Sequence, residues 1–158
     1  MRSQRSGFVI FRTCWLYGVY GRSFPKSILS KAKTASELEV VGDQIGRPTY
    51  THDIAEVFYQ LLSRNADLLL RQEGEIFHLA NHGMCSRADF AREVLRVASK
   101  EHVKVKSISS REVVRPAVRP KNSVLSLKKA EDELSVCLRD WRASVSEFVP
   151  LVDPEDRV

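Results

Sequence analysis

The sequence predicts an α/β fold with parallel strands, and two observations support this. Short apolar runs that suit strands alternate along the chain with segments whose apolar residues recur at helical spacing. The run at residues 8–11 is continuously apolar, which is typical of a strand covered on both faces. The chain has 158 residues, 43% hydrophobic and 28% charged. This composition fits one soluble globular domain and excludes a disordered segment.

The first strand, at 8–11, leads into a glycine-flanked loop and then a helix. Ser23 can cap this helix, and Pro25 sits in its first turn, where a missing N–H costs nothing. Its apolar stripe is Phe24, Ile28, Ala32 and Ala35. The segment therefore predicts a helix with one face against the core.

A second strand and helix follow. Residues 38–41 read as a strand that Gly42 stops. The next helix follows Thr51 and has Asp53 in its first turn, where the helix dipole favours a carboxylate. Its buried face is expected at Ile54, Phe58, Leu61 and Leu62.

The second half repeats the alternation. Residues 76–79 predict a strand, and Ser86 with Asp89 forms a capping box that opens a helix. Polar and apolar residues then alternate over 103–106, as in a half-exposed strand. The apolar residues of that third helix are Phe90, Val94, Val97 and Ala98.

Two shorter helices are expected near the end. Pro116 and Pro120 bracket a loop, and Asp140 can cap the last helix. Their apolar residues are Leu127, Ala130 and Leu134, then Trp141, Val145 and Phe148. We expect one folded unit at 8–151, with frayed termini at 1–7 and 152–158.

Composition excludes several classes of protein. No apolar run approaches the roughly 20 residues that span a bilayer. The opening segment has an apolar run too short for a signal peptide, so a cytoplasmic protein is expected. Cysteines and histidines show no metal-ligand spacing, and the cysteines Cys14, Cys85 and Cys137 are expected to be small buried residues.

The net charge of +5 is concentrated in one stretch. Basic residues gather at Arg111, Arg115, Arg119, Lys121, Lys128 and Lys129. A nucleic-acid groove is one interpretation, but the stretch has no aromatic residue on which a base could stack. A solvated face with one or two phosphate-binding side chains is favoured, and no nucleic-acid partner is expected.

Three segments carry residues that a core does not require. At 13–18, Trp15 and Tyr17 follow the first strand, and the carboxyl ends of parallel strands line the ligand crevice of open α/β sheets. Either ring could lie against a sugar or a base. The alternative is that Trp15 caps the core beneath a loop.

The other two segments each present an arginine beside a proline. At 46–53, Arg47 precedes Pro48 and the start of a helix, whose free N–H groups suit an anion. At 118–125, Arg119 precedes Pro120, and a guanidinium can bind a diphosphate through two parallel hydrogen bonds. An ordinary helix-capping loop and a surface loop with solvated cations are the alternatives.

Together these segments resemble one known family. The family-like pieces are R-T-C-W-L-Y-G at 12–18, D-Q-I-G-R-P-T-Y at 43–50, H-D-I-A at 52–55, I-F-H-L-A-N at 76–81 and R-P-K-N-S-V-L at 119–125. In order and spacing they resemble the dTDP-4-dehydrorhamnose reductase family of extended short-chain dehydrogenases. The resemblance implies the C-terminal portion of such an enzyme over 8–151: the last parallel strands of a Rossmann-type sheet plus the small substrate-binding subdomain.

The resemblance also implies a chemistry. Such enzymes use NADPH or NADH to reduce the 4-keto group of a deoxythymidine-diphosphate sugar, in dTDP-L-rhamnose biosynthesis. A Y-x-x-x-K pair carries the proton chemistry and a glycine-rich loop holds the cofactor. Neither occurs here: the residues four after Tyr17, Tyr20, Tyr50 and Tyr59 are Gly21, Phe24, Ile54 and Ser63. We therefore expect neither catalysis nor NAD(P)H binding by this chain alone.

The resemblance assigns a binding pocket. Trp15 is expected to cover the sugar and Arg119 to bind the diphosphate or nucleotide, with Ser23 and Arg47 as further candidates. Ser23 stands where the family usually has asparagine. The sheet should also present an exposed edge, which suits either a homodimer or an N-terminal half that these residues lack.

Two other functions remain open. A non-catalytic regulatory subunit, resembling the β subunit of methionine adenosyltransferase, would suit a chain that lacks the Tyr–Lys pair. A fragment of a sugar-nucleotide epimerase or dehydratase shares the strand-end motif but does not predict the 43–50 segment.

Overall fold

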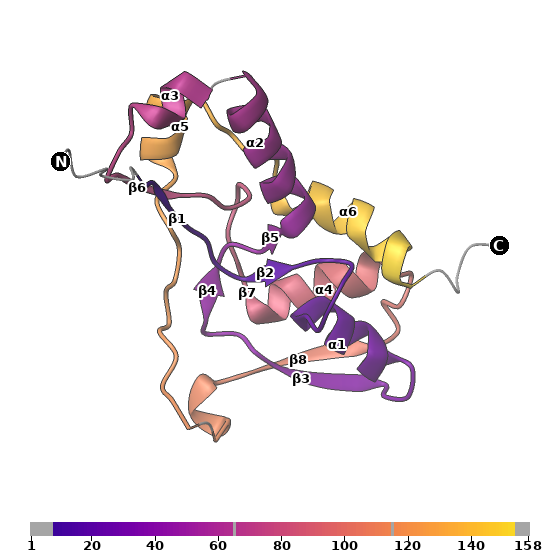
Figure 1. Cartoon of the computed structure of the whole chain (residues 1–158). Coiled ribbons are helices and arrows are strands. Elements are labelled where there is room, and N and C mark those ends of the chain that lie inside the picture. Colours follow the sequence, from indigo (N-terminus) through magenta and orange to yellow (C-terminus); the bar gives the residue numbers. More distant parts are fainter. Residues whose placement is uncertain (1–7, 65, 115, 154–158) are drawn as a thin grey trace.

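A computed structural model describes residues 8–64, 66–114 and 116–153 of the chain (Figure 1). The strands are β1 (Ile10–Arg12), β2 (Leu16–Tyr17), β3 (Glu37–Val41), β4 (Ile45–Gly46), β5 (Thr49–Tyr50), β6 (Ile76–His78), β7 (Cys85–Ser86) and β8 (Lys104–Ile108). The helices are α1 (Phe24–Ala32), α2 (Thr51–Arg64), α3 (Ala66–Leu70), α4 (Arg87–Val97), the 3-10 turn η1 (Ser110–Glu112), α5 (Lys128–Leu134) and α6 (Trp141–Val152).

In the described part of the chain the strands pair two by two. β1 pairs with β6, β2 with β5 and β3 with β8, all parallel, while β4 and β7 are antiparallel. Parallel partners that lie far apart in sequence require helical crossovers. The predicted α/β architecture is therefore observed, and each expected strand and helix has a counterpart within a few residues of its predicted bounds.

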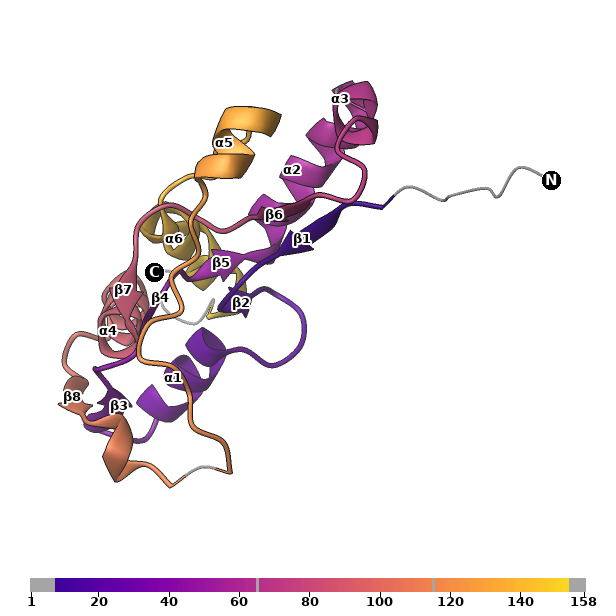
Figure 2. The same cartoon turned by 90° about the vertical axis from the view of Figure 1, so that its left-hand side faces the viewer.

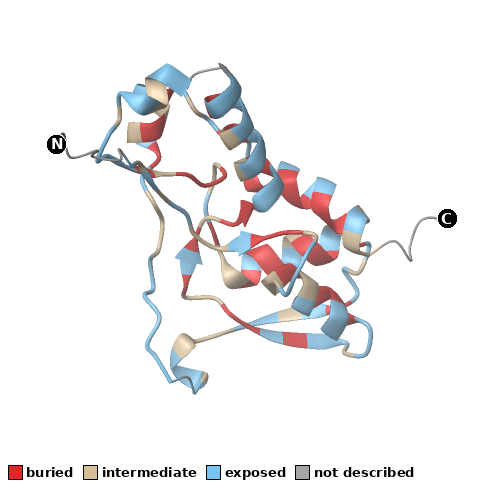
Figure 3. Cartoon of the chain, viewed as in Figure 1, coloured by how far each residue is buried: buried red, intermediate tan, exposed pale blue. Residues whose placement is uncertain are grey.

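One apolar cluster lies around α1, α4 and α6, beside the β3–β8 pair (Figure 1). Leu38 and Val40 of β3 are buried, whereas Glu39 faces solvent and binds Lys106 of β8 at 2.7 Å. This alternation explains why one face of the pair packs on helices while the other stays charged. Figure 3 shows buried residues along the inner sides of α4 and α6.

A second cluster joins β1 and β6 to α2 and α5. Phe11 and Phe77 are register partners on adjacent strands, and their ring centroids lie 5.8 Å apart. Phe58 of α2 meets the Phe11 ring edge-on at 4.9 Å. Figure 2 shows this group at one end of the molecule and α1, β3 and β8 at the other, with residues 116–127 running between them.

Helix capping follows the sequence at α4 but not at α1. Ser86 and Asp89 form the predicted reciprocal capping box. Ser23 occupies the N-cap position of α1, yet its side chain accepts no hydrogen bond from that helix. The Ser23 hydroxyl is instead buried and finds no partner among the described residues.

Asp53, at the start of α2, is the centre of a buried polar network. Its Oδ2 accepts hydrogen bonds from Asn81 Nδ2 and Ser144 Oγ, each at 2.6 Å. Its Oδ1 accepts a bond from Arg139 Nη2 at 2.7 Å. Asn81 in turn accepts a bond from the Tyr50 amide at 2.9 Å. The network joins α2 of the second cluster to α6 of the first.

Tyr17 differs from the sequence prediction. It is 2% exposed and packs among Tyr50, Phe90 and Phe148. Trp15 has a φ of +46°, so the backbone turns between the two residues and separates their side chains. Burial, reinforced by the nearby Asp53 charge, raises the pKa of Tyr17 and keeps it neutral. Tyr17 is a core residue, not a ligand-stacking one.

The ends of the expected unit are described only in part. α6 continues to Val152, and the buried carboxylate of Asp153 binds Lys100 at 2.6 Å. The frayed termini expected at 1–7 and over the last five residues lie outside the described residues. No helix in the described ranges is both long and apolar enough to cross a bilayer.

Replacing Asp53 with asparagine tests the polar network. The change removes the charge that Arg139 neutralises, and we expect the free energy of unfolding to fall by about 2–3 kcal/mol. Burial alone would raise the pKa of Asp53, but hydrogen bonds from Arg139, Ser144 and Asn81 outweigh it and hold the pKa below 3.8. The contribution is therefore complete above that value and is lost as the pH falls through the folded-state pKa.

Urea denaturation at about pH 7 and about pH 2.5 measures both effects, since the difference between wild type and variant should shrink in acid. Asp132→Asn is the matched control, because Asp132 is exposed and pairs with Lys128 one helical turn away. An equal loss of stability in both variants would contradict the role of Asp53.

Candidate functional site

The segments at 12–18 and 43–50 are joined by their backbones. β2 pairs with β5, and the Thr49 amide donates to the Trp15 carbonyl oxygen at 3.1 Å. The Cys14 thiol donates to the Arg47 carbonyl oxygen at 3.4 Å. These bonds fix Trp15 relative to the segment that follows β3.

The segment at 119–125 is held against 43–50 as well. The Ile45 amide donates to the Lys121 carbonyl oxygen at 2.7 Å, and the Ser123 amide donates back to Ile45 at 2.9 Å. These bonds fix the chain directly after Arg119. All three segments that the sequence singled out therefore meet at one place.

Asp43 anchors the start of this arrangement. Its carboxylate accepts two hydrogen bonds from Ser110 at 2.9 Å, one from the backbone amide and one from the hydroxyl. Desolvation would raise the pKa of Asp43, but the bonds from Ser110 outweigh it and lower the pKa. The ionised carboxylate thus ties η1 to the end of β3.

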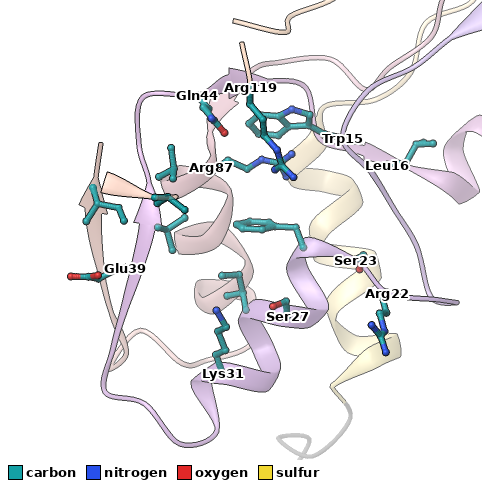
Figure 4. A pocket seen from close by; sticks show the side chains of 16 residues that line it. Trp15, Leu16, Arg22, Ser23, Ser27, Lys31, Glu39, Gln44, Arg87 and Arg119 are labelled. Carbon is teal, nitrogen blue, oxygen red and sulfur yellow. The ribbon is translucent and has the colours of Figure 1, made fainter. Parts of the chain in front are cut away.

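A cavity of about 530 Å³ opens beside this junction (Figure 4). Trp15, Ser23 and Arg119, which were predicted together as residues of one binding pocket, all line it. Its walls come from the segment after β1, from α1, from β3 and from the start of α4. Figure 4 shows the Arg119 and Arg87 side chains close to the Trp15 ring.

Arg47 is placed differently from the other three. Its Nε donates to the Leu125 carbonyl oxygen at 3.0 Å, and its Nη1 donates to the Gly83 carbonyl oxygen at 2.8 Å. It does not contribute to the cavity lining. Arg47 therefore binds the loop that follows Arg119 to the turn before β7.

Trp15 is held in position from both sides. The Arg87 guanidinium carbon lies 3.7 Å from the centre of the Trp15 ring, a cation–π contact. On Gly46, a Cβ atom would lie 2.3 Å from Trp15 Cε2, so only glycine allows this close approach. The positive φ of Trp15 is uncommon for a bulky residue and is sustained by these surroundings.

The cavity is predominantly positive. The cations in its lining are Arg22, Lys31, Arg87 and Arg119. The acid in the lining is Glu39, whose charge is already offset by Lys106 at 2.7 Å. A concave surface lined by several cations favours an anionic ligand, and guanidinium groups suit phosphate oxygens.

Ser23 contributes a polar side chain to the cavity lining. Its Oγ is buried against the cavity, with no hydrogen-bond partner among the described residues. Buried hydroxyls in folded proteins are nearly always bonded, to protein or to another molecule. The Ser23 hydroxyl is thus an exception, a buried polar group without a hydrogen bond in the described part of the chain.

Sequence reasoning missed Arg22, Arg87, Lys31 and Gln44. Arg87 follows the capping serine of α4, and its position at a helix start was a usable signal. Gln44 belongs to the 43–50 motif and is 7% exposed in the cavity wall. Arg22 and Lys31 carried no sequence signal, because only the fold brings them into the lining of this cavity.

A family model described as RmlD substrate binding domain matches residues 1–153. The chain belongs to the RmlD substrate binding domain family. The predicted membership of the dTDP-4-dehydrorhamnose reductase family is thereby confirmed.

Curated relatives agree with this family. The RmlD domain of this chain is 36% identical over 150 residues to a dTDP-4-dehydrorhamnose reductase of Sinorhizobium fredii, covering 93% of this chain and 51% of the relative. It is also 36% identical over 140 residues to a spore coat polysaccharide biosynthesis protein of Bacillus subtilis, covering 89% and 46%. The chain thus spans about half the length of the curated relatives it matches.

Solved structures agree with the fold. A dTDP-4-dehydrorhamnose reductase from Clostridium acetobutylicum superposes with a TM-score of 0.80 at 38% identity, covering 90% of this chain and 48% of that one. A reductase of the same name from Bacillus anthracis, solved in complex with NADP, gives 0.76 at 30% identity, covering 90% and 48%. The predicted fold, the C-terminal part of an extended short-chain dehydrogenase, is confirmed for this RmlD domain.

Replacing Gly46 with alanine tests how Trp15 is positioned. The added methyl group would overlap the indole at 2.3 Å, while the backbone of Gly46 lies outside the left-handed region and accepts alanine without strain. We expect the ring to move toward solvent, with a loss of about 1–3 kcal/mol in stability. Tryptophan emission should shift to longer wavelength.

The Trp15→Phe background provides the control, because only the buried Trp141 then emits. In that background Gly46→Ala should leave the emission unchanged. An unshifted spectrum in the wild-type background would show that Gly46 does not set the position of the Trp15 ring.

Proposed function

We propose that this chain is the substrate-binding part of a dTDP-4-dehydrorhamnose reductase and that its cavity binds a deoxythymidine-diphosphate sugar. The observation that carries the proposal is the convergence of Trp15, Ser23 and Arg119 on one positively charged cavity. Relatives of both kinds, curated and structurally solved, bear this reductase name. A diphosphate supplies the negative charge that such a cavity favours.

The proposed roles follow from the chemistry of each side chain. Arg119 binds the diphosphate, because a guanidinium can donate two parallel hydrogen bonds to phosphate oxygens. Arg87 lies over Trp15 and supplies a second guanidinium at the same wall. Ser23 lines the same cavity as a further candidate, and Trp15 packs against the sugar or the nucleotide beside it.

Arg47 acts on the same site through the backbone. Its two hydrogen bonds join the loop after Arg119 to the turn before β7. Its guanidinium is therefore engaged with carbonyl oxygens, and its proposed contribution is to hold Arg119 in position.

NADPH or NADH would supply the hydride for reduction of the 4-keto group. This chain contains neither a glycine-rich loop nor a tyrosine followed four residues later by lysine. The residues of this chain therefore do not provide the glycine-rich loop that usually binds the pyrophosphate of the cofactor. We assign to this chain the binding and orientation of the sugar nucleotide, and no step of hydride or proton transfer.

Calorimetric titration with dTDP tests the proposal directly. We expect saturable binding at ligand concentrations up to about 1 mM, where even a weak site with ΔG near −4 kcal/mol is half occupied. Arg119→Ala should weaken binding at least roughly tenfold, since it removes the charge-assisted hydrogen bonds of an exposed guanidinium.

Arg71→Ala is the matched control, since Arg71 is also exposed but follows α3, away from the cavity lining. It should bind dTDP as the wild type does. Absence of binding by the wild-type chain would contradict the proposal and favour the regulatory-subunit alternative. Equal weakening by both variants would contradict the role assigned to Arg119.

A further inference from the structure

Gln44 is a buried residue whose side chain makes no hydrogen bond within the described part of the chain. It is 7% exposed. The other buried side chains that end in an amide, an aliphatic hydroxyl or a carboxylate are all bonded within the protein: Thr49, Asp53, Asn81 and Ser144. A buried amide without a partner is costly, because it gives up its hydrogen bonds to water and gains none in return. Gln44 therefore differs from the other buried side chains of this kind.

The backbone around Gln44 is held by two other segments. The Gln44 carbonyl oxygen accepts a hydrogen bond from the Arg87 amide at 3.2 Å, at the start of α4. The next amide, that of Ile45, donates to the Lys121 carbonyl oxygen at 2.7 Å. The side chain thus projects from a fixed position, and a binding group on a fixed backbone loses little freedom when a ligand arrives.

The Gln44 side chain contributes to the wall of the cavity. Figure 4 shows it at the same end of the cavity as Trp15 and Arg119. The cavity continues from there along α1, from Ser23 to Lys31. Eight residues of helix correspond to about 12 Å, at a rise of about 1.5 Å per residue. The cavity is therefore long enough for different parts of a ligand to meet different side chains.

The chemistry of an amide suits a sugar hydroxyl better than a phosphate. The amide oxygen accepts and the amide nitrogen donates, and a hydroxyl group can do both in return. A phosphate only accepts, and the guanidinium groups of Arg87 and Arg119 match it better. In a nucleotide sugar the hexose is bonded directly to the diphosphate. An amide beside these guanidinium groups is thus well placed for hexose hydroxyls.

We propose that the Gln44 amide binds a hydroxyl group of the hexose and makes the site prefer a sugar nucleotide to the nucleotide alone. This role rests on the proposed binding of a deoxythymidine-diphosphate sugar, and it identifies a side chain that recognises the sugar portion. The nucleoside occupies the part of the cavity along α1, away from Trp15. The hexose hydroxyl supplies the partner that the Gln44 amide lacks among the described residues.

A structural role for Gln44 fits these observations less well. Asn81 is the example of a structural amide in this fold: it is fully buried, donates to Asp53 and Ser144, and accepts from the Tyr50 amide. The Gln44 side chain joins no such network in the described ranges. A buried group that does not stabilise the fold is typical of positions where binding determines the residue.

Gln44→Met tests the proposal, because methionine has a side chain of similar length without the two hydrogen-bonding groups. Calorimetry on the full chain compares dTDP-rhamnose with dTDP, and the wild type should bind dTDP-rhamnose more tightly. We expect the variant to bind dTDP-rhamnose about fivefold more weakly than the wild type, the effect of one neutral hydrogen bond, and dTDP within about twofold. Equal weakening for both ligands, or no change for either, would overturn the proposal.

Urea denaturation separates recognition from a structural role. Gln44→Met should not lower the midpoint of unfolding, because it removes a buried amide that has no partner in the described protein. Asn81→Leu is the contrast, since it removes a buried amide that is bonded to Asp53 and Ser144, and it should lower the midpoint. A similar fall in both variants would show that Gln44 supports the fold, contrary to the proposal.

The proposal for Gln44 and the dTDP proposal fail separately. A wild-type chain that binds neither ligand contradicts the binding of a sugar nucleotide altogether. A wild-type chain that binds dTDP, but dTDP-rhamnose no more tightly, leaves the nucleotide proposal intact and overturns the role of Gln44. Arg119→Ala should weaken the binding of both ligands, whereas Gln44→Met should weaken that of dTDP-rhamnose only.

Discussion

The buried carboxylate of Asp53 is the constraint on which the arrangement of the two apolar clusters depends. One cluster is built on α1, α4 and α6 and the other on α2, α5 and the β1–β6 pair. Asp53 belongs to α2, yet it accepts hydrogen bonds from Ser144 of α6 and from Arg139 just before it. A buried charge is tolerated only when it is fully paired, so the two clusters are held in one relative position. Asn81, which donates to Asp53, also accepts a hydrogen bond from the Tyr50 amide, so β5 is held by the same network.

The cavity inherits its shape from that arrangement. β5 pairs with β2, so fixing Tyr50 also fixes the strand that follows Trp15. The Trp15 ring then lies between the bare backbone of Gly46 and the Arg87 guanidinium. The side chains that line the cavity thus come from segments far apart in sequence, and backbone hydrogen bonds between those segments hold them together. This is a common way for loops on a scaffold to present a binding site.

Much of the fold could be read from the sequence, because its signals are local. The capping box at Ser86, the apolar stripe of α1 and the alternation in β8 all depend on neighbouring residues and were recovered. Local patterns also indicated Trp15 and Arg119 as candidate binding residues, and the fold places both in the lining of one cavity. They misplaced Tyr17, because the positive φ of Trp15 breaks the assumed extended chain. Nor could they show that Arg22 and Lys31 line the same cavity, or that Arg47 donates to two carbonyl oxygens, since both depend on tertiary structure.

The way in which Trp15 is held has a thermodynamic consequence. The Thr49 amide binds its carbonyl oxygen, the Arg87 guanidinium lies over its ring, and the bare backbone of Gly46 closes the other side. The ring is therefore positioned before any ligand arrives. A molecule that packs against it loses little affinity to the ordering of this side chain, because the protein has already ordered it during folding.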